Sequence, residues 1–281
     1  MVPGRHRASA IRLLIALAVI IMASRATLAG TTVAVMPFKC SAKPSACELW
    51  QEILSAELAR GSSILVVEQA QIDKVLAKLT QEQSMAYDSD GAVRLGKLLH
   101  ADYVLLGSIV QEGVSVVATG RFVNVVDGSL SGTATIEGRA DSWTTLASGF
   151  IGRLLAPSVS ASSFARGQGP DKALDGDTAS YWRTATGNFE GWIEVRFPLP
   201  VRYSKAGFVS PPTNTGAGVP RNFTLECLEG DRWSEVATGS GNMRLKWSGT
   251  FEARECRAWR LRVASVIDRS QELSISELSF E

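Results

Sequence analysis

The hydrophobic period of the chain changes near residue 157, and this change limits what each half can fold into. After that point apolar and polar residues alternate, as in Trp192–Phe197 and Trp259–Val263. A period of two places one set of side chains on one face of a strand, so Trp259, Leu261 and Val263 are expected to face a core. Short strands of this kind, separated by Gly, Pro and Asn, indicate a β-sandwich.

The first half has a different pattern, in which apolar strands alternate with helices. Apolar β-rich runs predict strands, and apolar residues three and four positions apart predict helices. Asp127-Gly128 between two β-rich runs predicts a hairpin turn. Strands alternating with helices and finished by a hairpin predict an α/β sandwich. The strands are expected at 32–38, 64–67, 102–110, 114–126 and 130–137, and the helices between Ser45 and Gly61 and at 69–79, 89–99 and 141–155.

The first of these helices carries a specific prediction about its start. Ser45 and Glu48 have the spacing of a capping box, in which each side chain bonds a free backbone N–H at the helix start. The helix behind this cap is expected to place Leu49, Ile53, Leu54 and Leu58 on one face.

A short segment separates the two patterns. Residues 156–163 are small and polar and contain Pro157, which is typical of a domain boundary. We therefore expect a two-domain α+β protein, with an α/β sandwich over 30–156 and a β-sandwich over 157–281.

The N-terminus has the features of a secretory signal over residues 1–29. A basic segment precedes the apolar run Leu13–Met22, and small residues offer cleavage sites after Ala26 or Ala29. The alternative is an uncleaved anchor, but the run is shorter than the ~20 residues that span a bilayer. No cysteine follows either site, so we expect no lipid anchor there, and we expect a periplasmic or secreted protein.

Charge and motifs exclude two classes of ligand. Removal of Arg5, Arg7, Arg12 and Arg25 with the signal lowers the 29 basic residues to 25, against 28 acidic ones, so the remaining charge is near −3. This balance gives no basic patch for nucleic acid. Neither a Gly-x-x-x-x-Gly-Lys nor a Gly-x-Gly-x-x-Gly motif is present, so we expect no nucleotide site.

The four cysteines favour disulfide bonds, because export places them in an oxidising compartment. Cys40 and Cys47 lie in the first half, and Cys227 and Cys256 lie in the second. Four cysteines allow three pairings, and one bridge in each half is the simplest. Zinc is the alternative, although no Cys-x-x-Cys motif is present and no histidine lies nearby.

The histidine content argues against several catalytic mechanisms. His100 is the only histidine after the signal, so any Ser-His-Asp or Cys-His mechanism would have to use it. It lies where a helix gives way to a strand, and a helix end favours a residue of left-handed conformation and a cation there. Glycosidases need paired carboxylates in a domain that is usually larger than the first half. We therefore expect a structural His100 and no enzymatic activity.

Several segments of the first half together resemble a known periplasmic fold. They are Val33–Phe38, Val66–Leu76, Leu95–Ser108 and Arg121–Gly128, in that order. They resemble the core shared by the curli secretion channel family and the lipoprotein activators of penicillin-binding proteins, and more loosely the N-terminal domain of the Tol-system propeller protein. The resemblance implies a domain that docks an envelope protein or assembles into oligomers, in a bacterium of Gram-negative type. Pore formation is not expected, because no surplus strands are present to span a membrane.

The second half resembles the discoidin family, the coagulation-factor type C domain related to galactose-binding-like modules. The matching segments are Ala173–Trp182, Gly191–Val195, Pro220–Glu226, Trp259–Arg262 and Ser274–Phe280. The resemblance implies an eight-stranded jelly roll with ligand loops at one end.

The same resemblance implies a structural calcium ion, since hard oxygen ligands from a turn and a distant carboxylate suit Ca²⁺. The alternative is that the two aspartates of the turn only make turn hydrogen bonds. The matching ligand positions are the Lys172 carbonyl, Asp175, Asp177, Ser180 and Glu277.

A sugar site needs an exposed aromatic ring and polar groups that fix hydroxyls. Trp182, Trp192 and Trp259 fall on core positions of the family, so the candidates come from turns. Trp247 is the strongest of them, because a solvent-facing tryptophan needs a reason. The full set of candidates is Arg183, Asn188, Phe189, Asn214, Arg244 and Trp247.

These features predict an exported, non-enzymatic envelope protein. Its C-terminal domain is expected to bind a carbohydrate or cell-envelope polymer, and its N-terminal domain to dock a protein partner. The alternative is an accessory or oligomeric component of an envelope secretion or cell-wall system.

Overall fold

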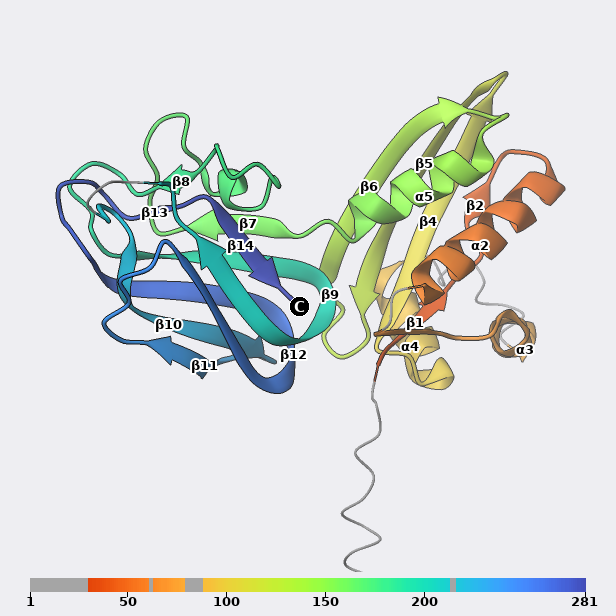
Figure 1. Cartoon of the computed structure of the whole chain (residues 1–281). Coiled ribbons are helices and arrows are strands. Elements are labelled where there is room, and N and C mark those ends of the chain that lie inside the picture. The colour runs from red at the N-terminus through yellow and green to blue at the C-terminus, as the bar shows by residue number, and fades with distance from the viewer. Residues whose placement is uncertain (1–29, 61–62, 79–87, 213–215) are drawn as a thin grey trace, which may run out of the picture. The chain divides into compact units, whose positions relative to one another are not determined.

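The computed structural model describes residues 30–60, 63–78, 88–212 and 216–281 (Figure 1). The predicted signal segment 1–29 lies outside them. Residues 31–281 group into one compact unit, so the division at residue 157 stays a prediction and the two sheets are described separately. None of the described helices is both long and apolar enough to cross a membrane.

The first sheet has six strands in the order β3-β1-β4-β5-β6, with β2 paired to β4. β1 runs parallel to β3 and β4, while β4, β5 and β6 form an antiparallel meander. Gly128 has a left-handed φ of 71° in the turn that leads to β6, which confirms the predicted hairpin. The strands are β1 (Thr31–Val35), β2 (Lys39–Cys40), β3 (Ile64–Val66), β4 (Tyr103–Glu112), β5 (Ser115–Asn124) and β6 (Leu130–Arg139).

Helices cover both faces of this sheet, as the α/β pattern predicted (Figure 1). Leu105 points to the core under α2 and α5, and its neighbour Leu106 points to the core under α3 and α4. Adjacent strand residues face opposite sides, so a central strand between two helical layers is apolar on both. The helices are α2 (Pro44–Ala59), α3 (Gln69–Lys78), α4 (Ser89–Leu99) and α5 (Trp143–Leu154).

The prediction for the start of α2 is wrong. The helix begins at Pro44, with Lys43 as its N-cap residue and no side-chain capping bond, so Ser45 already lies within the first turn. Proline suits this position because its missing N–H has no partner there in any helix. The buried face carries Trp50, whereas Leu49 is 43% exposed.

Helix α4 matches its prediction at both ends. Asp88 caps its start by accepting a hydrogen bond from Gly91 N at 2.6 Å. His100 ends it in the left-handed conformation with φ 53°, and Ala101 N then donates to Gly96 O at 2.9 Å. The expected left-handed conformation of His100 at this helix end is confirmed.

The second sheet also has six strands, in the order β11-β10-β12-β9-β14, with β7 paired to β9. β8 and β13 form a separate pair, and the sheet does not close, since β11 and β14 end its path in the described residues. The strands are β7 (Ser158–Ala161), β8 (Trp182–Arg183), β9 (Gly191–Val209), β10 (Pro220–Glu229), β11 (Arg232–Gly239), β12 (Lys246–Val266), β13 (Ser274–Ile275) and β14 (Glu277–Phe280), and the short 3₁₀ helix η2 (Pro170–Ala173) precedes β8.

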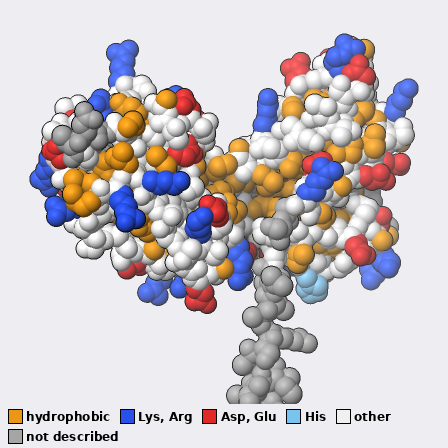
Figure 2. Space-filling view, viewed as in Figure 1, with side chains coloured by type: hydrophobic (Ala, Val, Ile, Leu, Met, Phe, Trp, Pro, Cys, Tyr) orange, Lys and Arg blue, Asp and Glu red, His pale blue; other side chains and the backbone are white. Residues whose placement is uncertain are grey.

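The core of this half is the one that the period of two predicted. Ile193 and Val195 on β9, and Leu261 and Val263 on β12, are buried in one cluster together with Trp182. Arg260 and Arg262 on the opposite face of β12 are not buried; both pair with Glu226. Figure 2 shows basic and acidic side chains scattered over the visible face, with apolar side chains between them.

Both disulfide bonds form as predicted. Cys40 of β2 is bonded to Cys47 of α2, and Cys227 of β10 to Cys256 of β12. The second pair is fully buried beside Trp259. Glu229 lies near these two sulfurs, but their covalent bond leaves no thiolate to bind a metal.

Loss of the second disulfide is expected to cost more stability than loss of the first. The bridges close loops of 29 and 7 residues, for which chain entropy gives about 3–4 and about 2 kcal/mol. The measurement is urea unfolding of the Cys227→Ala/Cys256→Ala and Cys40→Ala/Cys47→Ala proteins. A larger loss from the Cys40–Cys47 pair would contradict this account.

Candidate functional site

The acidic turn that follows η2 is built by short-range hydrogen bonds. Asp175 Oδ1 accepts from Asp177 N, and Asp177 Oδ1 accepts from Ala179 N, both at 2.9 Å. Such turns form because an aspartate side chain can replace a backbone acceptor two residues before the donor. Gly176 between them has a φ of 76°, which a side chain would disfavour.

Four of the five predicted calcium ligands come together at this turn. The Ser180 hydroxyl donates to Asp175 Oδ2 at 2.5 Å and lies 3.4 Å from the Lys172 carbonyl oxygen. Glu277, which begins β14, accepts from Gly176 N at 3.2 Å through Oε2. This bond joins a carboxylate near the C-terminus to a turn about a hundred residues earlier.

Among the described residues, Asp177 is hydrogen-bonded to the other predicted ligands through its backbone only. Its side chain accepts from Ala179 N, and the carboxylate oxygens of Asp175, Asp177 and Glu277 do not all lie within 4.8 Å of one another. The Lys172 ammonium lies 3.9 Å from Asp175 Oδ2 and neutralises part of the local charge. The donor set of carbonyl, hydroxyl and carboxylate oxygens suits Ca²⁺, although a cation would need further oxygens from backbone or water to reach six ligands.

The two carboxylates of this corner have opposite pKa shifts. The Ser180 hydroxyl, the Asp177 N–H and the Lys172 charge lower the pKa of Asp175. Partial burial raises the pKa of Glu277; the Gly176 N–H opposes this shift, and the negative charge of Asp175 adds to it. A cation beside Glu277 would relieve both unfavourable contributions.

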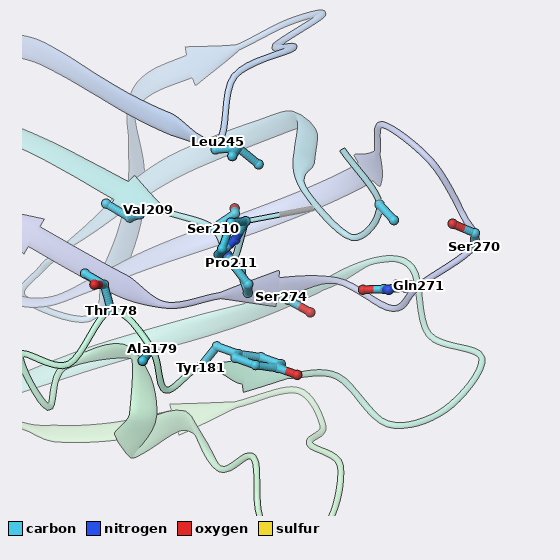
Figure 3. A pocket seen from close by; sticks show the side chains of 12 residues that line it. Thr178, Ala179, Tyr181, Val209, Ser210, Pro211, Leu245, Ser270, Gln271 and Ser274 are labelled. Carbon is cyan, nitrogen blue, oxygen red and sulfur yellow. The ribbon is translucent and has the colours of Figure 1, made fainter. Parts of the chain in front are cut away.

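A cleft of about 1160 Å³ adjoins the same turn (Figure 3). Its walls come from the turn, from the end of β9 and the segment after it, from the residue before β12, and from the segment that leads into β13. The residues that line it are Thr178, Ala179, Tyr181, Val209, Ser210, Pro211, Pro212, Ala217, Leu245, Ser270, Gln271 and Ser274.

The cleft combines one aromatic ring with several neutral polar groups. Tyr181 is half-buried, and its ring lies on the same side of the cleft as Gln271 and Ser274 (Figure 3). Ser210 is 2% exposed, and its hydroxyl has no hydrogen-bond partner. A buried hydroxyl without a partner costs about 1–3 kcal/mol, which a water or a ligand in the cleft could offset.

Trp247 does not have the exposed ring that the sequence analysis expected. It is partly buried against the sandwich core, stacked on Phe208 at 5.9 Å and edge-on to Phe223 at 4.9 Å. Trp247 lies on the core-facing side of β12, and Gly249 leaves room for its ring. The premise of a solvent-facing ring is therefore wrong, and ligand binding by Trp247 itself stays a prediction.

The predicted loop residues Arg183, Asn188 and Phe189 lie together but do not line the cleft. The Arg183 guanidinium is 4.0 Å from Glu272, which also accepts from Gly187 N. Asn188 donates to the Ser163 hydroxyl at 3.2 Å, and the Phe189 ring packs against the core. These contacts hold the loop in place and leave Arg183 Nε buried without a partner.

The remaining two candidates are placed differently. Arg244 is exposed, and Asn242 binds its backbone in the turn before β12. Asn214 lies outside the described residues.

Sequence reasoning missed the residues that do line the cleft. The signal for Tyr181 is its place directly after the acidic turn, next to the buried Trp182. Because adjacent residues of an extended chain face opposite sides, Tyr181 lines the cleft while Trp182 lies in the core. Ser210 and Gln271 carry no local signal. Ser210 follows β9, which pairs with β14, and Gln271 precedes β13, which pairs with β8 directly after the turn.

Comparisons with known proteins give a limited result. No family model matches the chain, and no curated protein matches it. Similar solved structures include the family 32 carbohydrate-binding module of Clostridium perfringens NanJ in complex with galactose, at 15% identity and TM-score 0.40, covering 44% of this chain and 92% of that one. Chitosan-binding module 2 of a Paenibacillus sp. IK-5 chitosanase/glucanase, in complex with chitotriose, has 19% identity and TM-score 0.39, covering 45% of this chain and 96% of that one. At these scores the likeness carries no argument, so the fold description rests on the strand order above.

Proposed function

We propose that this protein is an exported, non-enzymatic envelope protein that binds a carbohydrate in the cleft beside the acidic turn. The observation that carries the proposal is the half-buried Tyr181 ring in one cleft with hydroxyl and carboxamide side chains. An aromatic face suits the apolar face of a pyranose, and such polar groups can both donate to and accept from sugar hydroxyls. The resemblance of residues 157–281 to the discoidin family supports the same function.

The proposal predicts that binding depends on the Tyr181 ring and not on its hydroxyl. Tyr181→Ala is expected to weaken binding at least about tenfold, a loss of about 1.4 kcal/mol, whereas Tyr181→Phe keeps the ring and most of the affinity. The measurement is isothermal titration calorimetry with the glycan that binds best in a panel of envelope and plant oligosaccharides. Phe164→Ala is the matched control, since Phe164 is an exposed aromatic residue outside the cleft.

Unchanged affinity in the Tyr181→Ala protein would contradict this assignment of the cleft. Failure of every glycan to bind the wild-type protein would contradict the function itself.

A calcium ion held by the Lys172 carbonyl, Asp175, Ser180 and Glu277 is the second part of the proposal. Without a cation, the raised pKa of Glu277 means that stability from this group is present at low pH and is lost as pH rises through that pKa. With a cation bound, the ionised carboxylate becomes a favourable ligand. Calcium would stabilise the folded protein in proportion to its occupancy.

Substitution of Glu277 is therefore expected to change stability in opposite directions without and with calcium. In chelator at neutral pH, Glu277→Gln is expected to raise the melting temperature, and the gain should disappear below the ordinary glutamate pKa of about 4.3. In excess Ca²⁺ the same variant should melt below the wild type. Differential scanning calorimetry tests both, with the exposed Glu235→Gln on β11 as the control; a wild-type melting temperature that calcium does not change would contradict the metal site.

Docking of a protein partner by residues 30–156 is the third part, and it is supported by the family resemblance. The described surface of this half has a hollow of about 630 Å³ between α2 and the start of α3, which is the surface to examine first. Acidic side chains dominate its charged groups. They are Glu48, Glu52, Glu68 and Asp73.

The alternative function, an oligomeric assembly component, predicts a different size in solution. Light scattering of the intact protein should give a monomer if it acts as a binding protein. A defined oligomer would contradict the binding-protein proposal for this half and favour the assembly role.

A further inference from the structure

The cleft beside the acidic turn offers a ligand no charged side chain among the described residues. Its polar lining consists of hydroxyl groups and the Gln271 carboxamide, and its apolar lining of Val, Pro, Leu and Ala. From this lining we infer that the ligand is a neutral glycan rather than an acidic envelope polymer. The inference rests on the proposed carbohydrate-binding function and narrows its ligand class.

Two of the residues that line the cleft are held by carboxylates. Asp268 accepts from both the backbone N–H and the hydroxyl of Ser270 at 2.9 Å. Asp177 accepts from Ala179 N at 2.9 Å on the other wall. The side chains that fix these two parts of the lining are therefore acidic, and they give a bound anion no counter-charge.

The nearby cations do not form an anion site in the cleft. The Arg269 guanidinium lies 5.7 Å from the centre of the Phe189 ring, which is outside the lining. Arg244 and Lys246 flank the lining residue Leu245 in sequence, and both are exposed to solvent. Exposed cations of this kind attract an anion only weakly and are screened by salt.

The cost of removing water from the ligand also favours a neutral glycan. Moving an ionised carboxylate or phosphate from water to a partly apolar cleft is costly unless a cation or several donors pair with it. The desolvation free energy of a sugar hydroxyl is much smaller, because the polar groups of the lining can replace its hydrogen bonds to water. The affinity of the protein for a neutral glycan should also be insensitive to ionic strength, because no ion pair contributes to binding.

The test compares neutral, acidic and basic oligosaccharides on the intact protein by isothermal titration calorimetry. The probes are N-acetylated chitin and galactan oligomers, oligogalacturonate, and deacetylated chitosan of similar length. We expect a neutral oligomer to bind at least about tenfold more tightly than oligogalacturonate, with an affinity that changes less than about twofold between roughly 20 and 500 mM NaCl.

Tighter binding of oligogalacturonate, weakened by salt and abolished by Tyr181→Ala, would overturn the inference while the carbohydrate-binding function stands. Tighter binding of chitosan than of chitin would overturn it in the same way. Absence of binding by every probe would overturn the inference together with the proposed function.

A charge placed in the cleft gives an independent test. Gln271 is exposed on the cleft wall, so Gln271→Lys is expected to fold normally and to raise affinity for oligogalacturonate by about two- to fivefold, the size of an exposed ion pair, at low salt. Thr238→Lys on β11 adds the same charge away from the cleft and should leave that affinity unchanged. Equal effects of the two substitutions would contradict a neutral cleft as the source of selectivity.

Discussion

The hydrogen bond from Gly176 N to the Glu277 carboxylate joins the acidic turn to the last strand of the protein. β14 pairs with β9, and this register places Val209 and Ser210 beside the turn. The acidic turn contributes Thr178, Ala179 and the neighbouring Tyr181 to the lining of the cleft. This contact and the pairing of β14 with β9 therefore place the candidate cation ligands beside the cleft.

This arrangement separates the roles of charge and of neutral polarity. The turn concentrates carboxylates whose oxygens face Lys172, Ser180 and Gly176. The cleft receives the other side of the same segment, with small and hydroxyl side chains. Because the Asp177 carboxylate is used by the turn itself, the turn is held without a charge entering the cleft.

Features set by local sequence were predicted well. The bounds of α4, the left-handed His100 at its end, the Asp127-Gly128 hairpin and the period-two core of the sandwich all follow from short-range preferences. Both disulfides followed from the simplest pairing of the four cysteines, which is one bridge in each half of the sequence.

The errors have a common physical cause, which is tertiary packing. Trp247 looked like a ligand platform in a turn, but its strand places the ring against Phe208 and Phe223. The predicted capping box at Ser45 does not form, because the helix already begins at Pro44, which suits the first turn of a helix. Ser210 and Gln271 could not be recognised locally, because they reach the cleft only through the pairing of strands distant in sequence.

The most direct test of the central claim is to map where a sugar binds. Amide chemical-shift changes would be recorded while the intact protein is titrated with the neutral oligosaccharide that binds best. The account predicts that the largest changes cluster at Thr178, Tyr181, Ser210, Gln271 and Ser274. Changes centred on Trp247 and Arg244, or on the first sheet and its helices, would contradict it.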